Sequence, residues 1–192
     1  MKTTGNERKY VAKEDGKCDI KIRHATPSDI ASVCSIYDNI HTAEENGIAK
    51  IGWVRGIYPI RETAEGALSR GELFVGEADG KVVGTAIINH EQPEVYGRAE
   101  WKYELPDEKV MVLHTLVIDP LAKGCGYGKA FVSFYEQYAR ESGCESLRMD
   151  TNMLNENARA FYNRLGYTEV GIFPCDFNGI ESINLVMLEK KL

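Results

Sequence analysis

The chain has 192 residues, of which 43% are hydrophobic and 27% are charged. These values are typical of a single globular domain and exclude disordered, collagen-like and fibrous proteins. The formal net charge of −6 disfavours a polyanionic partner such as nucleic acid. No apolar run approaches the ~20 residues that cross a bilayer, so we also expect no membrane partner.

Residues 1–18 are polar and lack an apolar core of their own. We therefore predict a flexible N-terminal tail rather than a secretory signal, followed by one domain over residues 19–192. The five cysteines are odd in number and scattered, and the four histidines are equally dispersed. This pattern predicts a reduced, cytoplasmic protein without a metal site.

The first half of the chain predicts a strand, two helices and an antiparallel strand pair. Thr26 to Asp29 supply an N-cap residue, a proline at the first helical position and an acid in the first turn. Asp79-Gly80 is a strong two-residue hairpin signal. In chain order, the predicted elements are a strand at 19–23, a helix from Thr26 through Ile40, a weaker helix from Pro59 to near Gly71, and strands at 72–78 and 81–89.

The second half predicts a central strand and then alternating helices and strands. Val110 to Ile118 is apolar on both alternating faces, which indicates a strand covered on both sides. A long, mostly acidic segment, 90–108, precedes it. The further elements are a helix from a glycine-rich segment to about Ser142, a strand at 147–150, a helix at 155–165, and strands at 167–173 and 180–189 around residues 176–179. This order indicates a mixed sheet with helices on both faces.

Three glycines between 124 and 128 stand where the central strand leads into a helix. Such a turn lets backbone N–H groups and the helix dipole face a phosphate, although it also serves simply to pack a helix close to a sheet. The P-loop pattern fails, because it requires glycine in place of Lys123 and a hydroxyl residue in place of Ala130. The dinucleotide pattern fails because its third glycine falls on Lys129.

Two motifs together resemble the GCN5-related N-acetyltransferase (GNAT) family. Lys123 to Gly128 is similar to the family's pyrophosphate loop, Gln/Arg-x-x-Gly-x-Gly/Ala, with lysine as a departure at the first position. Asn155 to Tyr162 is similar to the family's Asn-x-x-Ala-x-x-Phe-Tyr helix. The resemblance covers roughly residues 19–189 in element order. It implies the GNAT fold of the α/β (α+β) class, with a central mixed, mostly antiparallel sheet of about seven strands and helices on both faces.

The resemblance implies transfer of an acetyl group from acetyl-CoA to the primary amine of a small molecule, by direct attack in a sequential mechanism and without a metal. A non-catalytic acyl-CoA-binding module and a protein or peptide N-acetyltransferase remain alternatives, and a homodimer remains open. The backbone N–H of Leu116 or Val117 is the implied oxyanion donor. The implied cofactor-binding residues are Leu116, Val117, Ile118, Lys123, Gly124, Cys125, Gly126, Tyr127, Gly128, Lys129, Asn155, Ala158 and Tyr162.

Candidate catalytic residues follow from the same resemblance and from chemistry. Tyr162 matches the family's proton donor to the departing thiolate, since a phenol with a pKa near ~10 keeps its proton at neutral pH; plain packing is the alternative. Asn155 would bind the cofactor arm, cap its helix, or do both. His114 interrupts the apolar central strand, is predicted to share a face with Leu116, and is the best candidate base. The alternative for His114 is a hydrogen-bonded core histidine.

The acceptor pocket is less defined. Trp53 and Tyr58 lie in a glycine-bearing loop and would contact the apolar body of an amine. Carboxylates from segment 91–108 would bind its ammonium group. Scattered surface charge explains most of those acids equally well. A Cys125–His114 nucleophile is disfavoured, because Cys125 would point toward the pyrophosphate. The sequence does not identify the acceptor.

Overall fold

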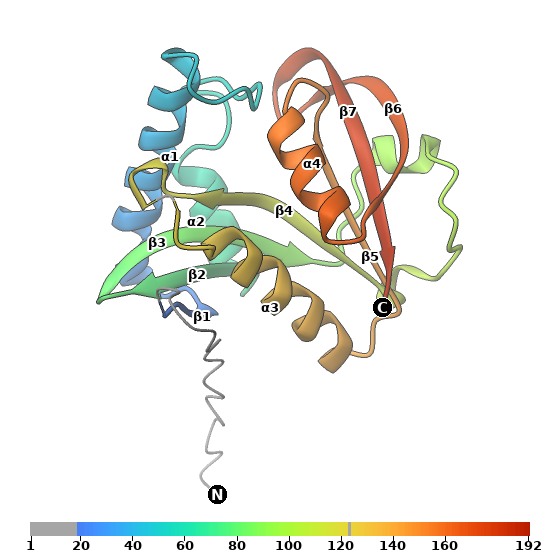
Figure 1. The fold of residues 1–192 in the computed structure, drawn as a ribbon, viewed down its shortest axis with the longest axis horizontal. Coiled ribbons are helices and arrows are strands. Elements are labelled where there is room, and N and C mark those ends of the chain that lie inside the picture. Colours follow the sequence, from blue (N-terminus) through green and yellow to red (C-terminus); the bar gives the residue numbers. More distant parts are fainter. Residues whose placement is uncertain (1–18, 123) are drawn as a thin grey trace, which may run out of the picture.

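The computed structural model describes residues 19–122 and 124–192, so the predicted tail 1–18 and Lys123 lie outside it. In the described part, seven strands form one sheet in the order β1-β2-β3-β4-β5-β7-β6 (Figure 1). Strands β4 and β5 are parallel and the other neighbours are antiparallel, which confirms the predicted mixed sheet. The elements are β1 (Lys21–His24), α1 (Ile30–Glu45), α2 (Arg61–Ser69), β2 (Leu73–Ala78), β3 (Lys81–Asn89), β4 (Val110–Ile118), α3 (Tyr127–Glu141), β5 (Ser146–Asn152), α4 (Glu156–Arg164), β6 (Thr168–Phe177) and β7 (Ile180–Lys191).

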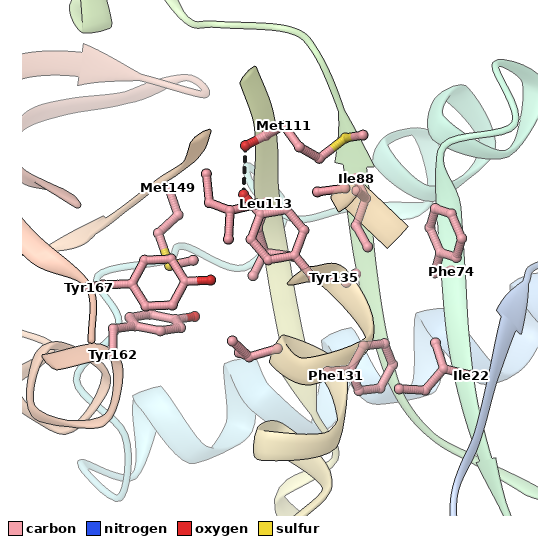
Figure 2. Close-up of a cluster of buried hydrophobic side chains, with 14 of the residues drawn as sticks. Ile22, Phe74, Ile88, Met111, Leu113, Phe131, Tyr135, Met149, Tyr162 and Tyr167 are labelled. Carbon is pink, nitrogen blue, oxygen red and sulfur yellow. Dashed lines mark hydrogen bonds between the residues drawn. The ribbon is translucent and has the colours of Figure 1, made fainter. Parts of the chain in front are cut away.

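Helices α3 and α4 cover one face of the sheet (Figure 1). The apolar face of α3 includes Phe131 and Tyr135, which are fully buried. It packs on Leu113 of β4 and Met149 of β5 (Figure 2), and we call the core on this side of the sheet the α3-side cluster. The hydroxyl of Tyr135 donates a hydrogen bond to the backbone oxygen of Met111 at 2.6 Å. Helix α3 is thereby fixed to the central strand, and its N-terminus is held beside the end of β4.

Two different structures cover the opposite face. Helices α1 and α2 pack on β2, β3 and the end of β4, for example through Val33 and Ile36. The segment 90–108, predicted as a long, mostly acidic connection, covers β4, β6 and β7 with two buried residues of a short 3₁₀ helix, Val95 and Tyr96. The predicted arrangement of helices on both faces is confirmed. No helix in the described ranges is both long and apolar enough to traverse a bilayer.

Two strand boundaries differ from the prediction. Strand β5 is longer than the predicted 147–150, because its pairing with β7 continues to Asn152. Strand β6 runs on to Phe177, so the turn is Asn178-Gly179 and not residues 176–179. Both turn residues have positive φ, at 52° and 78°, as a tight hairpin turn requires.

Strand β4 carries a β-bulge at Thr115. Thr85 of β3 pairs with Val117, whereas Ile87 pairs with His114, so β4 has one extra residue in this interval. Thr115 has φ of 49°, an uncommon conformation for a β-branched residue. The bulge resets the alternation of side chains, and Leu116 packs on the α3-side cluster. The prediction that His114 and Leu116 share a face was therefore wrong.

The parallel pairing of β4 with β5 is short. It runs from Val110 and Ser146 to Leu113 and Met149, after which β4 continues along β3 and β5 continues along β7. The two central strands therefore diverge beyond Leu113. This divergence leaves one backbone edge of residues 114–118 without a neighbouring strand and positions the site described next.

Candidate active site

A cleft lies where β4 and β5 diverge. Its walls come from the α1–α2 connection, β4, β5, α4 and the β6–β7 hairpin. A second pocket adjoins it on the side of α2 and shares Tyr58, His114 and Phe177 with it. The cleft brings together predicted residues from three parts of the chain, the α1–α2 connection, β4 and α4 with its N-cap residue: Trp53, Tyr58, His114, Leu116, Asn155, Ala158 and Tyr162.

The N-terminus of α3 lies at the end of the glycine-rich turn. Gly126 is its N-cap residue in the left-handed conformation, with φ of 75°, and among the described residues no side chain is hydrogen-bonded as a cap at this end of the helix. A Cβ atom at Gly124 or Gly126 would meet nothing within 4 Å. The positive end of the helix dipole thus faces open space, which suits an anion. Lys129 is exposed in the first turn of α3, and Lys123 lies outside the described residues.

Cys125 packs against the α3-side cluster and is not among the residues that line the cleft. Tyr127 is buried in the same cluster, so its side chain anchors the start of α3. The structure therefore does not bring Cys125 and His114 together in the cleft.

Tyr162 combines packing with access to the cleft. Its ring is 8% exposed and meets the ring of Tyr167 edge-on, with 5.9 Å between centroids (Figure 2). Burial, and then the negative charge of Asp150, raise the pKa of Tyr162 above its usual value, so the phenol keeps its proton at neutral pH. Asn155 caps α4, because its Oδ1 accepts a hydrogen bond from the N–H of Ala158 at 3.2 Å. The predicted capping role of Asn155 is confirmed.

His114 is held through one ring nitrogen. Its Nε2 lies 3.1 Å from Oδ1 of Asn89 and 3.1 Å from the backbone oxygen of Glu91. Since a carbonyl oxygen only accepts, Nε2 carries the proton and Nδ1 is the basic nitrogen. Burial lowers the pKa of His114 below its usual value, and so favours the neutral ring at pH 7. A neutral imidazole on the cleft wall can accept a proton.

The α1–α2 connection is fastened over the bulge. The hydroxyl of Tyr58 is hydrogen-bonded to the hydroxyl of Thr115, and burial raises the pKa of Tyr58 to about 12. Trp53 meets Tyr58 edge-on, with 5.9 Å between ring centroids. The backbone N–H of Ile51 donates to the carboxylate of Glu44 at 2.6 Å. The predicted acceptor aromatics thus form a fixed wall of the cleft.

Sequence reasoning missed Asp150 and Tyr96. Asp150 lines the cleft from β5, and its Oδ2 accepts a hydrogen bond from the buried hydroxyl of Tyr96 at 2.9 Å. Burial raises the pKa of Asp150 to about 6. The available signal was a pair of charged residues, Arg148 and Asp150, on one face of the strand predicted at 147–150.

Comparison with known proteins identifies the family. The model of the Acetyltransferase (GNAT) family matches residues 35–167. The chain belongs to this family. The matched GNAT region contains β4, the glycine-rich turn and α4, the elements that form the cleft and its borders.

Individual relatives agree with this assignment. An uncharacterized N-acetyltransferase of Methanocaldococcus jannaschii is 24% identical over 77% of this chain, which spans 60% of that protein's length. An aminoglycoside N(6')-acetyltransferase type 1 of Stenotrophomonas maltophilia is 26% identical, covering 77% of this chain and 86% of the relative. A GNAT-family crystal structure from Streptococcus agalactiae has a TM-score of 0.74 at 21% identity, over 90% of this chain and 95% of that one. This last likeness shows a shared GNAT fold.

Proposed function

We propose that this protein transfers the acetyl group of acetyl-CoA to the primary amine of a small molecule, by direct attack in a sequential mechanism. The observation that carries the proposal is the pairing, in one cleft, of a phenol that keeps its proton, Tyr162, with a neutral imidazole, His114. One relative, the aminoglycoside N(6')-acetyltransferase, is named for a small-molecule acceptor.

The residues present fit acetyl-CoA, which supplies the acetyl thioester. The uncapped N-terminus of α3 and the open space beside Gly124 and Gly126 would receive the pyrophosphate. Exposed Lys129 adds positive charge there. The backbone edge of residues 114–118, which has no strand neighbour on the β5 side, would bond the amides of the pantetheine arm. A backbone N–H of Leu116 or Val117 on this edge would polarise the thioester carbonyl.

Two residues would move protons. An alkyl amine has a pKa near ~10 and arrives as an ammonium, so it must lose a proton before nitrogen attacks. His114 would accept this proton at Nδ1, directly or through water. As the C–N bond forms and the C–S bond breaks, Tyr162 would donate its proton to the sulfur. The nitrogen loses a second proton once the C–N bond has formed, and this proton restores the phenol of Tyr162, directly or through water. The proton taken by His114 is released to solvent, so the net products are the amide, the CoA thiol and one proton.

Thiol release from acetyl-CoA, measured against separate panels of small amines, polyamines, aminoglycosides, amino acids and peptides, tests this function. Release with a small amine, together with the acetylated product by mass spectrometry, supports the proposal. Release with peptides alone would favour a peptide N-acetyltransferase. Binding of acetyl-CoA without release in any panel would favour a non-catalytic acyl-CoA-binding module.

A further inference from the structure

Asp150 has no part in the proton transfers above, yet it lines the same cleft as His114 and Tyr162. It stands on β5 one residue beyond the last β4–β5 pair, Leu113 with Met149. In this parallel register Asp150 is level with His114, on the face away from the α3-side cluster. Within the described residues only its Oδ2 is hydrogen-bonded, to the hydroxyl of Tyr96, so Oδ1 remains available to a ligand in the cleft.

The protein provides no cation for this carboxylate among the described residues. Arg148, the nearest charged residue on the same strand face, is paired with Glu189 at 3.6 Å and lies over the ring of Trp101 at 4.1 Å. A recessed carboxylate normally requires a positive partner, because burial disfavours its charge. The titratable groups that face Asp150 or share its cleft are Tyr96, Tyr58, Tyr162, Cys175 and His114.

We infer that Asp150 binds the ammonium group of the acceptor through Oδ1, and that Tyr96 is the residue that positions this carboxylate. The inference rests on the proposed function, and it narrows the acceptor to amines that are cationic when they bind. Trp53, Tyr58 and Phe177 line the same cleft and would contact an apolar or aromatic body attached to that ammonium. The amine nitrogen is thereby held between Asp150 and His114.

A binding experiment that needs no turnover tests the charge recognition. Phenethylamine and its neutral analogue 2-phenylethanol are titrated calorimetrically into the CoA-saturated protein. We expect the wild type to prefer the ammonium, and Asp150→Asn to weaken phenethylamine binding by ~30-fold or more while leaving 2-phenylethanol unchanged. Glu94→Gln, which removes an exposed carboxylate beside Tyr96, is the matched control and should keep the preference. A wild type without preference, or an Asp150→Asn variant that retains it, would overturn the inference.

The pH profile of kcat/KM tests the positioning role of Tyr96. Amine binding requires ionised Asp150, so kcat/KM should rise with pH around its pKa of about 6. The hydrogen bond from Tyr96 lowers the pKa of Asp150. Tyr96→Phe should therefore move this limb to higher pH, which a purely structural loss would not do. Neutral His114 is also required as the base, so its titration adds to the acid side of the wild-type profile. His114→Asn should therefore retain the limb of Asp150, and adding Asp150→Asn to this variant should abolish it.

The two experiments separate the inference from the proposed function. If the ammonium preference depends on Asp150 but no amine releases thiol, the acetyl-transfer proposal fails while the ammonium site stands. If amines are acetylated but the acid limb of the His114→Asn variant survives the addition of Asp150→Asn, or the limb does not move in Tyr96→Phe, the assignment of Asp150 and Tyr96 is wrong.

Discussion

Replacing Asp150 by asparagine is expected to stabilise the folded protein while it impairs amine binding. Burial raises the pKa of Asp150 from its usual 3.8 to about 6, so the folded state holds this proton more tightly than the unfolded chain does. Ionisation at neutral pH therefore opposes folding. Asparagine has nearly the same shape and still accepts the hydrogen bond from Tyr96, but it has no charge to desolvate.

The size and pH range of the effect follow from this pKa. Below about pH 3 the carboxyl group is protonated in both states and contributes no difference. Between about pH 4 and about 6 the folded protein retains a proton that the unfolded chain has largely lost, so the free energy of unfolding falls as the pH rises. The full shift corresponds to ~3 kcal/mol, and ~2 kcal/mol is a reasonable expectation because Asp150 keeps part of its surface exposed.

Urea unfolding of the wild type and Asp150→Asn, from pH 3 to 8, measures this difference. We expect the two free energies of unfolding to agree near pH 3 and the variant to be ~2 kcal/mol more stable at pH 7.5. Glu94→Gln controls for the loss of a carboxylate and should change stability by less than ~0.5 kcal/mol. A variant that is less stable at pH 7.5, or a difference that does not depend on pH, would refute the reasoning.

Three further substitutions test other parts of the site and core. Tyr162→Phe should lower kcat by ~10²-fold without changing the melting temperature. The control Tyr167→Phe should keep kcat within a few-fold of the wild-type value. A near-normal kcat for Tyr162→Phe would contradict its role as the acid. Gly126→Val and Gly143→Val place a side chain at φ of 75° and 76° at opposite ends of α3, each at a cost of ~1–2 kcal/mol. Only Gly126→Val should weaken CoA binding, by ~10-fold or more in calorimetry, and equal affinities would exclude the pyrophosphate site. Tyr37→Phe removes a buried hydroxyl that has no hydrogen-bond partner among the described residues, and should raise the free energy of unfolding by ~1 kcal/mol in urea; a decrease would show that the hydroxyl is bonded.

Local signals in the sequence were sufficient for most of the fold. The central strand was predicted with its observed bounds, Val110–Ile118, because both of its faces are covered and both are apolar. The hairpin at Asp79-Gly80 was predicted because these two residues adopt the positive φ values that a tight turn requires, 50° and 72°. Each of these features depends on neighbours in sequence, which explains why sequence patterns were able to identify them.

The bulge at Thr115 could not be predicted in this way. A β-branched residue is uncommon at positive φ, and the apolar pattern of the strand continues through it unchanged. The conformation is compatible with contacts from distant segments: the pairing of the flanking residues Val117 and His114 with β3, and the hydrogen bond between the hydroxyls of Thr115 and Tyr58. A pattern of period two has no means of showing one inserted residue, so the face of Leu116 was assigned wrongly.

The role of Asp150 depends on three non-local facts: the parallel register with β4, the divergence of the two strands, and the arrival of Tyr96 from the segment that covers the sheet. Yet the strand itself contained a usable signal. Arg148 and Asp150 project from one face, so a sheet that buries this face must compensate two opposite charges. In the described part of the chain, Arg148 is paired with Glu189, whereas the carboxylate of Asp150 is bonded by the hydroxyl of Tyr96 alone. On this strand face, the charge of Arg148 is balanced within the protein, whereas the carboxylate of Asp150 faces the cleft. We therefore expect a cationic substrate to bind at Asp150.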